Sequence, residues 1–321
     1  MTAHDVAGVP TRLSLYDRVA HRAAAVVVSE YSTSFGMATR LLPPGSRGRI
    51  RDLYALVRLA DEVVDGATDE VGGSATDART RLDALEVETE LAVRTGYSTN
   101  VLVHAFGRTA REAGIGLELI APFFASMRMD LDRTEHDAES FETYVYGSAE
   151  VGGLMCLRVF LLAEPAEVRE ARYAELTVGA RALGAAFQKI NFLRDLADDF
   201  ERLGRSYFPD VDPRVFTETK KQAILDDIAA DLRRARDGIE RLPHGARPAV
   251  RVACALFAEL VDRLESTPAP DLLRTRVSVP GVVKAQVAAR ALRPEASRLP
   301  MVGARLGGAG TGETASTRET Q

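Results

Sequence analysis

Tryptophan is absent from this sequence of 321 residues, and cysteine occurs only twice, as Cys156 and Cys254. Both cysteines lie in apolar, helix-like stretches, which predicts buried free thiols and argues against a disulfide framework or a zinc site. The five histidines are scattered, with no spacing typical of metal ligands. These absences fit a reducing compartment, and we expect a cytoplasmic protein.

A hydrophobic run long enough to span a membrane is also missing. The nearest stretch, from Leu154 to Ala163, contains Arg158 and is far shorter than the roughly 20 residues that a membrane helix needs, so it predicts a buried helix. The N-terminus shows no basic-then-apolar signal pattern. A net charge of -5 gives no general attraction to nucleic acid, and we expect no nucleic-acid partner. An anionic substrate would have to be held by local cations or by metal.

Helical periodicity is what the sequence has in abundance. Ala, Leu, Arg and Glu recur at helical spacing almost throughout, and alternating apolar-polar runs are scarce. With Pro and Gly at the breaks, the pattern predicts helices over residues 14–30, 46–66, 76–95, 98–113, 117–132, 139–163, 166–201, 216–241, 246–265 and 280–293. We expect one all-α domain over residues 13–295, with a flexible N-terminus at 1–12 and a disordered, Gly- and Thr-rich tail at 296–321.

A narrow polar stripe runs along the second of these predicted helices. At about 100° per residue, Asp61 and Asp65 share one face with Tyr54 and Arg58. Apolar residues occupy most of the remaining circumference, so we expect the helix to be buried around the stripe. A fully solvated face would not be so selectively polar, whereas a stripe that lines a cavity would be.

A second stripe lies in the longest predicted helix. Gln188, Asn191, Asp195 and Asp199 share an arc of roughly 80°, and the neighbouring arc is apolar. Buried Asn and Gln side chains need partners, because burying an amide without hydrogen bonds costs about 1–3 kcal/mol. This helix therefore also predicts a polar stripe that faces a cavity.

The spacing of the acids indicates a metal-dependent chemistry. Two carboxylates one helical turn apart repel each other, and burial increases the repulsion. Mg²⁺ prefers oxygen ligands and commonly bridges one or two carboxylates to substrate phosphates. Two such helices facing each other would form a cavity with diphosphate chemistry at its mouth and apolar walls below. Asp227 and Asp231 have the same spacing, but nearby Lys and Arg residues explain that pair as a solvated face with ordinary ion pairs.

Four ordered motifs sharpen this interpretation. They are YSTSF at 31–35 with LYALVRLADEVVD at 53–65, YVYGSAEVG at 144–152, QKINFLRDLADD at 188–199 followed by GRSYFP at 204–209, and the segment from Arg276 to Arg290. In this order and spacing, from about residue 30 to 292, the chain resembles the phytoene/squalene synthase family, most of all its bacterial phytoene synthases. The resemblance implies an isoprenoid-synthase-type helical bundle around a central cavity. One departure is Glu150, where many relatives carry a small residue.

The resemblance also implies a role for each matching residue. Metal ligands would be Asp61, Asp65, Asn191, Asp195 and Asp199. The diphosphates would be bound by Ser32, Ser34, Arg58, Gln188, Asn191, Arg194, Arg205 and Tyr207. The catalytic set would be the four aspartates with two tyrosines beside the reacting carbons, Tyr54 and Tyr144. Structural roles also fit some of these residues, with Arg58 and Arg194 as partners of neighbouring acids and the two tyrosines as core aromatics.

The implied enzyme is a prenyltransferase that condenses two prenyl diphosphates head to head, with Mg²⁺ as cofactor and Mn²⁺ as an alternative. One substrate ionises, the second attacks it to give a cyclopropyl diphosphate, and rearrangement with loss of a proton yields phytoene from two geranylgeranyl diphosphates. Farnesyl diphosphate would give dehydrosqualene in the same way, or squalene if NADPH supplied a hydride.

Other classes stay open at this point. Chain-elongating synthases and terpene cyclases also use paired acid motifs, but elongating synthases usually show a doubled aspartate where Asp61 is followed by Glu62 here, and the loop 204–209 disfavours both. A non-catalytic helical assembly protein should have lost the motif acids, which are intact. The oligomeric state is unreadable from the sequence. A product insoluble in water suggests peripheral contact with the inner face of the membrane.

Overall fold

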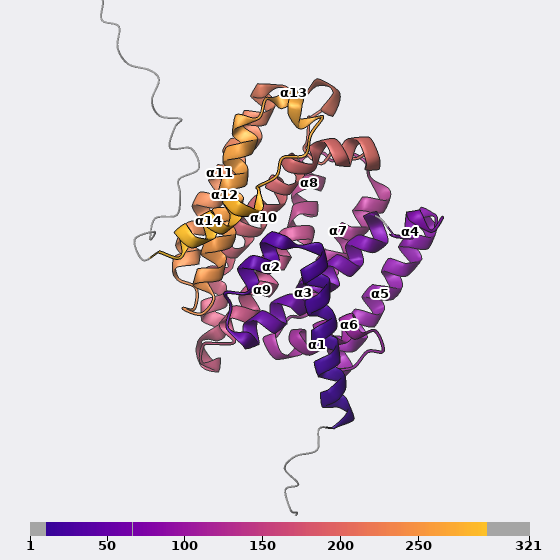
Figure 1. Ribbon diagram of the computed structural model, residues 1–321. Helices are drawn as coiled ribbons and strands as arrows, with labels where there is room; N and C mark the ends of the chain where they lie inside the picture. Colours follow the sequence, from indigo (N-terminus) through magenta and orange to yellow (C-terminus); the bar gives the residue numbers. More distant parts are fainter. Residues whose placement is uncertain (1–10, 66, 294–321) are drawn as a thin grey trace, which may run out of the picture.

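All regular secondary structure in the described residues, 11–65 and 67–293, is helical, which confirms the predicted all-α fold (Figure 1). The helices of this computed structural model are α1 (Arg12–Tyr31), α2 (Thr33–Thr39), α3 (Pro44–Asp65), α4 (Ala67–Glu70), α5 (Ala75–Thr95), α6 (Val101–Ala113), α7 (Leu117–Asp132), α8 (Ala138–Val145), α9 (Val151–Leu161), α10 (Arg169–Leu203), α11 (Glu218–Glu240), α12 (Arg247–Ser266), α13 (Ala269–Leu272) and α14 (Gly281–Ala291). A π-helical turn, Tyr146–Glu150, joins α8 to α9, and short 3₁₀ turns lie at Ala166–Val168 and Pro213–Val215.

Most predicted helices have the expected bounds to within a few residues, while the short α2, α4 and α13 were not predicted. The predicted termini fall largely on residues 1–10 and 294–321, which lie outside the described residues, so the predicted domain bounds are untested. At the N-terminal edge, the Thr11 side chain caps α1 by accepting a hydrogen bond from the Ser14 amide.

The one helix predicted over residues 139–163 is interrupted by the π-helical turn. Gly147 in this turn lies so close to α7 that a Cβ would be 2.1 Å from Ser126 Oγ. A side chain there would need the two segments to separate, so the turn depends on glycine. Glu150, the departure noted in the sequence, ends the turn and accepts a hydrogen bond from Arg181 Nε of α10 at 2.6 Å.

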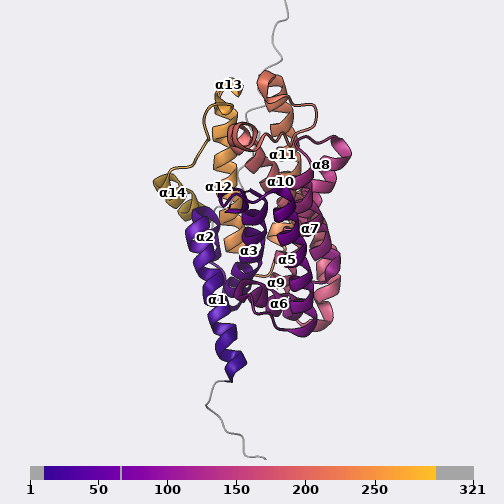
Figure 2. The ribbon, with the colours of Figure 1, turned by 90° about the vertical axis from the view of Figure 1, so that its right-hand side faces the viewer.

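The helices pack side by side along one long axis, as Figure 2 shows. α10 contacts α9, the π-helical turn, α11 and α12, whereas α3 contacts α1, α5, α6, α7 and α9. α12 packs against both α2 and α14, so the C-terminal part of the described chain lies beside its N-terminal part (Figure 1). α3 and α10, which carry the two acidic stripes, both contribute walls to one cavity.

Two buried hydrophobic clusters support this cavity. The first joins α3, α5, α6, α7 and α9, and the second joins α10, α11, α12 and α13. Leu53 of the first cluster and Leu260 of the second also line the cavity. Because a fully buried Leu or Phe contributes about 1.5–3 kcal/mol, the clusters can offset the cost of an open interior. Within the described part of the chain, no helix combines the length and apolar character that crossing a membrane requires.

Glycines bring α9 and α10 into main-chain contact. A Cβ on Gly153 would lie 2.5 Å from the carbonyl oxygen of Ala180, and a Cβ on Gly184 would lie 2.5 Å from the carbonyl oxygen of Ala149. Real Cβ atoms essentially never approach a carbonyl oxygen so closely. The separation of these two helices is therefore set by their backbones.

A buried carboxylate ties α1 and α6 to α3. Asp52 of α3 is fully buried, with His21 Nδ1 of α1 at 2.8 Å from Asp52 Oδ2. Thr109 of α6 donates a hydrogen bond to the same oxygen at 2.7 Å. The hydrogen bond to Asp52 is the largest influence on His21 and, against the opposing effect of burial, raises the pKa of the imidazole above its ordinary value.

This ion pair predicts a pH-dependent stability. The folded pKa of His21 lies above the unfolded value of about 6.5, so the stabilisation is complete below about pH 6.5 and is lost as the pH rises through the folded pKa. We expect the difference in free energy of unfolding between wild type and His21→Gln to shrink from about pH 6 to about pH 9. Urea denaturation across this range measures it, and a difference that does not change with pH would contradict the prediction.

The glycine contact predicts opposite effects for two neighbouring substitutions. Gly153→Ala should lower the free energy of unfolding by about 1–3 kcal/mol, the usual cost of overpacking. Gly152→Ala is the matched control, because a Cβ on Gly152 meets no atom within 4 Å. Alanine favours a helix over glycine by about 0.5–1 kcal/mol, so this variant should be at least as stable as wild type. Chemical denaturation compares them, and equal stability of the two variants would show that the contact is not tight.

Candidate active site

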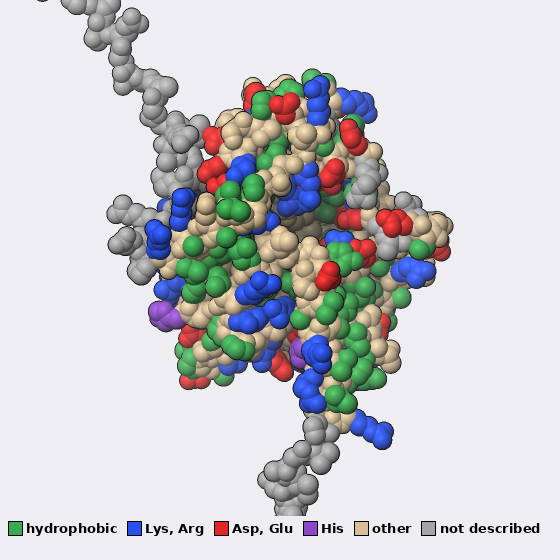
Figure 3. All heavy atoms as spheres, viewed as in Figure 1, with side chains coloured by type: hydrophobic (Ala, Val, Ile, Leu, Met, Phe, Trp, Pro, Cys, Tyr) green, Lys and Arg blue, Asp and Glu red, His purple; other side chains and the backbone are tan. Residues whose placement is uncertain are grey.

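A cavity of about 1150 Å³ lies between the helices, and Figure 3 shows a hollow among basic and acidic side chains on one face of the molecule. Its walls come from α2, α3, the π-helical turn with α9, α10, α11, α12 and the segment that leads into α14. The predicted site residues that line it are Ser32, Ser34, Tyr54, Arg58, Asp61, Asp65, Gln188, Asn191, Arg194, Asp195 and Asp199. The structure therefore brings both predicted stripes to one cavity and leaves Tyr144, Arg205 and Tyr207 out of its lining.

The α3 side of the cavity is organised by stacked rings and a guanidinium. The Tyr54 ring stacks on Phe35 of α2, with 4.8 Å between the ring centroids. Arg58 forms an ion pair with Glu62 one turn along α3, and its guanidinium lies 4.3 Å from the centroid of the Tyr31 ring. Arg58 thus has the structural partner that the sequence allowed, while its side chain still lines the cavity.

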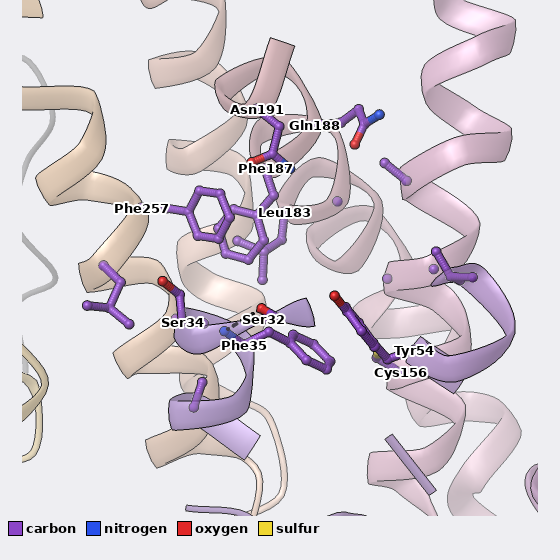
Figure 4. Close-up of a pocket in the computed structure, with 18 of the residues that line it drawn as sticks. Ser32, Ser34, Phe35, Tyr54, Cys156, Leu183, Phe187, Gln188, Asn191 and Phe257 are labelled. Atoms are coloured by element: carbon purple, nitrogen blue, oxygen red, sulfur yellow. Dashed lines mark hydrogen bonds between the residues drawn. The ribbon is translucent and has the colours of Figure 1, made fainter. Parts of the chain in front are cut away.

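The middle of the cavity is aromatic. Phe187 of α10 stacks on Phe257 of α12 with 3.9 Å between the ring centroids (Figure 4). In this view Gln188 and Asn191 lie above the ring pair and Ser32 lies below it. Ser32 also caps α2, because its hydroxyl accepts a hydrogen bond from an amide of the first turn. Aromatic faces carry a negative quadrupole, so these rings can stabilise a positively charged carbon chain without hydrogen bonding to it.

The α10 side places one aspartate between two arginines. Asp195 Oδ1 accepts hydrogen bonds from Arg194 Nε at 2.8 Å and from Arg276 Nε at 2.6 Å. Burial opposes ionisation of Asp195, but the hydrogen bonds and charges of these arginines outweigh it and lower the pKa of the carboxyl group. Arg276 precedes α14, so this contact fastens the segment before that helix to α10 at the cavity.

Two other aspartates in the cavity have the opposite shift. Burial and the neighbouring Asp65 raise the pKa of Asp61 to about 7. Burial and the charges of Asp195 and Asp65 raise the pKa of Asp199 to about 7. Near neutral pH these carboxyl groups therefore hold protons for much of the time unless positive charge approaches them.

The chemistry of these side chains fits a divalent cation. Neighbouring carboxylates raise one another's pKa because their charges repel. A doubly charged ion would reduce this repulsion, and Mg²⁺ takes oxygen ligands. Within the described residues, no group of three or more acidic, histidine or cysteine side chains is arranged to hold an ion by itself. An ion here would need further oxygen ligands, and Mg²⁺ usually obtains these from water and substrate phosphates.

Asp130 of α7 is a buried acid behind the cavity. It forms hydrogen bonds with Tyr144, Tyr207 and Arg205, the three predicted site residues that do not line the cavity. Asp130 accepts hydrogen bonds from Tyr144 Oη at 2.8 Å and from Tyr207 Oη at 3.1 Å. Arg205 donates to the Asp130 carbonyl oxygen at 2.9 Å and, through Nη1, to Asp65 Oδ1 at 2.5 Å. Burial, partly opposed by the charge of Arg205, raises the pKa of Asp130 to about 7.

This arrangement differs from the roles that the resemblance implied. Tyr144 is 3% exposed and lies outside the cavity lining, and its hydroxyl donates a hydrogen bond to Asp130, which fits the structural role that the sequence also allowed. A buried phenol needs a hydrogen-bond partner, and Asp130 provides it. Arg205 does not face the cavity either. It reaches the site through Asp65, whose carboxylate it holds in place.

Sequence reasoning missed Asp130, Arg276 and the Phe187–Phe257 pair. Asp130 follows Phe123 and Met127 at helical spacing on the buried face of α7. A lone acid on an apolar face is costly without partners, so this position did carry a signal. Arg276 lies 81 positions from Asp195 in a segment without helical periodicity, and nothing in the local pattern indicates that contact.

The Asp130 cluster predicts a graded loss of stability. Asp130→Asn should lower the free energy of unfolding by about 1–3 kcal/mol, because an amide cannot reproduce both hydrogen bonds that the buried carboxyl group makes with Tyr144 and Tyr207. Tyr144→Phe removes one of these hydrogen bonds and should cost less, about 1 kcal/mol. Urea denaturation at about pH 5 to 6 measures both, because a folded pKa of about 7 means that the buried carboxyl is mostly protonated there and the substitution removes no buried charge. An Asp130→Asn variant with the same free energy of unfolding as wild type would contradict the role given to this carboxyl group.

Comparisons with known proteins agree with this geometry. The squalene/phytoene synthase family model matches residues 28–282. The phytoene synthase of Mycobacterium tuberculosis is 30% identical over 294 residues, covering 85% of this chain and 90% of that protein. The 15-cis-phytoene synthase of Synechococcus elongatus is 29% identical, with 79% of this chain and 86% of that protein covered.

Solved structures support the same assignment at the level of the fold. The crystal structure of a dehydrosqualene synthase in complex with a ligand superposes with a TM-score of 0.70 at 20% sequence identity, covering 86% of this chain and 96% of that chain. The family match spans most of the chain, and it includes both acidic stripes. The predicted resemblance is thereby confirmed, and the chain belongs to the squalene/phytoene synthase family.

Proposed function

We propose that this protein condenses two molecules of geranylgeranyl diphosphate head to head and forms phytoene. The observation that supports this most strongly is the shared cavity, in which the aspartates of α3 and α10 meet above apolar and aromatic walls. Such a cavity suits a substrate with an anionic head and a long hydrocarbon tail. The mycobacterial and cyanobacterial relatives named as phytoene synthases favour the C20 substrate.

Magnesium, with manganese as an alternative, would supply positive charge that stabilises departing pyrophosphate. The residues that would hold it are Asp61, Asp65, Asp195 and Asp199, with Asn191 as a neutral oxygen ligand. Arg205 would contribute indirectly, because its ion pair with Asp65 fixes that carboxylate. Tyr207 and Tyr144 would act on the same side through Asp130.

Three arginines would bind the diphosphates. Arg58, Arg194 and Arg276 line the cavity, and each is paired with an acid in the structure. Diphosphate oxygens would compete for these guanidinium groups through charge-assisted hydrogen bonds. Gln188, Ser32 and Ser34 also line the cavity and provide neutral hydrogen-bonding groups.

The walls below would protect the cationic chain. Once one diphosphate leaves, the double bond of the second substrate attacks the allylic cation, and loss of a proton closes the ring of a cyclopropyl diphosphate. Loss of the second diphosphate, rearrangement and loss of one proton give phytoene. Water would trap either cation as an alcohol, so the apolar lining matters for the product. The Phe35–Tyr54 and Phe187–Phe257 ring pairs would face this charge.

Two alternative functions remain from the sequence: condensation of farnesyl diphosphate and a non-catalytic assembly role. Condensation of farnesyl diphosphate would give dehydrosqualene, or squalene with NADPH. The solved structures named for those activities share 20% sequence identity or less with this chain, so they support only the fold. A non-catalytic assembly role is disfavoured because the motif acids are kept and line the cavity. The cytoplasmic location, with peripheral contact at the membrane, stays a prediction.

A product assay decides the substrate. Purified protein with Mg²⁺ is incubated separately with farnesyl and geranylgeranyl diphosphate, with and without NADPH, and the extracted lipid is identified by mass spectrometry. We expect a C40 hydrocarbon with a conjugated triene at its centre, formed from geranylgeranyl diphosphate without need of NADPH. A C30 product made only from the C15 substrate would overturn the choice of substrate, and no condensation of either would overturn the proposed function.

Removal of a cavity carboxylate should abolish turnover selectively. Asp61→Ala should lower kcat by at least about 100-fold, because charge on the leaving pyrophosphate loses stabilisation. Asp227→Ala is the matched control, since Asp227 has the same helical spacing to a second aspartate but its side chain is 53% exposed and pairs with Lys189 outside the cavity lining. The control should stay within about twofold of wild type. Full turnover by Asp61→Ala would refute the metal assignment.

A further inference from the structure

One stretch of the cavity wall carries almost no side chains. Along the π-helical turn and α9, Ser148, Gly152 and Cys156 succeed one another at about one turn and all line the cavity. Ser148 Oγ is buried without a hydrogen-bond partner among the described residues, and burial raises the pKa of Cys156 to about 12. Ser148 and Cys156 are small, Gly152 has no side chain, and apolar residues such as Met155 and Leu157 line the same segment, so this part of the wall suits a hydrocarbon chain.

The glycines along this wall are of two kinds. Helix packing requires glycine at Gly153 and Gly184, because a Cβ on each would lie 2.5 Å from a main-chain oxygen of a neighbouring helix or turn, and it favours glycine at Gly179, where the nearest main-chain atom would lie 3.2 Å from a Cβ. Gly152 is different, because a Cβ there meets no atom within 4 Å and its backbone is ordinary α-helix. Neither packing nor backbone conformation calls for glycine at this position.

Glycine nevertheless has a cost at this position. In the middle of a helix it is less favourable than alanine by about 0.5–1 kcal/mol. What Gly152 gains in return is empty space on the cavity side, since it lines the cavity and an added Cβ would meet no atom within 4 Å. The space left by the missing side chain is therefore available to a molecule bound in the cavity.

The depth of Gly152 identifies the part of a substrate that would lie there. Gly153 contacts Ala180, and Gly184 contacts Ala149, so α9 and α10 run antiparallel and Gly152 lies near the level of Ala180. At 1.5 Å per residue, this level is about 20 Å along α10 from Asp195. A prenyl chain with its diphosphate at the aspartates would bring its distal isoprene units to this part of the wall.

We propose that Gly152 is a specificity-determining residue that makes room for the distal isoprene units of a C20 chain. This inference rests on the proposed prenyl condensation and deepens it by assigning the longer substrate to one position in the wall. A side chain at residue 152 would shorten the usable cavity for a C20 tail and would leave a C15 tail largely unaffected. Length selection would then follow side-chain volume at this one residue.

The test is a binding series that does not depend on turnover. Wild type, Gly152→Ala, Gly152→Val and Gly152→Leu are titrated by calorimetry, in the presence of Mg²⁺, with the S-thiolodiphosphate analogues of farnesyl and geranylgeranyl diphosphate. We expect Kd for the C20 analogue to rise with side-chain volume, by at least about tenfold at Leu, since displacing a few methylenes from an apolar pocket has effects of this size. Kd for the C15 analogue should change by less than about threefold.

Matched controls separate cavity filling from damage to the fold. Gly48→Leu makes the same change on α3, at a glycine whose Cβ also meets no atom within 4 Å and which does not line the cavity, so both Kd values should stay at wild-type levels. Thermal unfolding verifies each variant, and Gly152→Ala keeps the series informative if Gly152→Leu does not fold. Parallel changes in both Kd values, or none in folded variants, would overturn the role of Gly152.

Failure of the proposed function gives a different result. If wild type binds both analogues and the C20 affinity falls along the series, but neither diphosphate is condensed, then the inference on Gly152 stands and the proposed reaction is wrong. If wild type binds neither analogue, both proposals are overturned. In an active enzyme, the ratio of C40 to C30 product from an equimolar mixture should fall along the same series.

Discussion

Burial of several mutually repelling carboxylates at one cavity is the constraint on which the rest of this structure depends. Asp61 and Asp199 come from helices far apart in the sequence, and each has neighbouring aspartates that make its ionised form unfavourable. The protein offsets part of this cost with guanidinium groups, of which Arg205 and Arg276 contact carboxylates directly. A bound cation would relieve the remaining cost.

The sequence predicted the two stripes because helical period alone decides which side chains share a face. Asp61 and Asp65 follow Arg58 along one helix, and Asp195 follows Asn191 along another, so no knowledge of tertiary contacts was needed. The long helices were predicted for the same reason. The short α2, α4 and α13 escaped prediction because segments of one or two turns contain too few residues to establish a period.

Contacts between elements were the part that could not be read from the pattern. Tyr144 and Asp130 pair because a π-helical turn and its glycine bring α8 onto α7, and the sequence gives no sign of that geometry. The interpretation of Asp227 and Asp231 as a solvated face with ordinary ion pairs was wrong about the solvation of the second residue, although Asp231 does form an ion pair with Arg234 three positions along the helix. Asp231 is 4% exposed and accepts a hydrogen bond from Lys189 Nζ at 2.7 Å, across from α10. Local charge patterning could not reveal this partner, since it comes from another helix.

The glycine-mediated contact between α9 and α10 has a consequence for the thermodynamics of recognition. Where Gly153 and Gly184 meet main-chain carbonyl groups, the wall has no rotamers to freeze and no side chains to rearrange. A flexible hydrocarbon ligand loses much conformational entropy when it binds in a cavity. Side chains of the protein that also became ordered on binding would add to this entropic cost. A wall formed by main-chain atoms is already ordered when the protein has folded, so ligand binding does not have to order it.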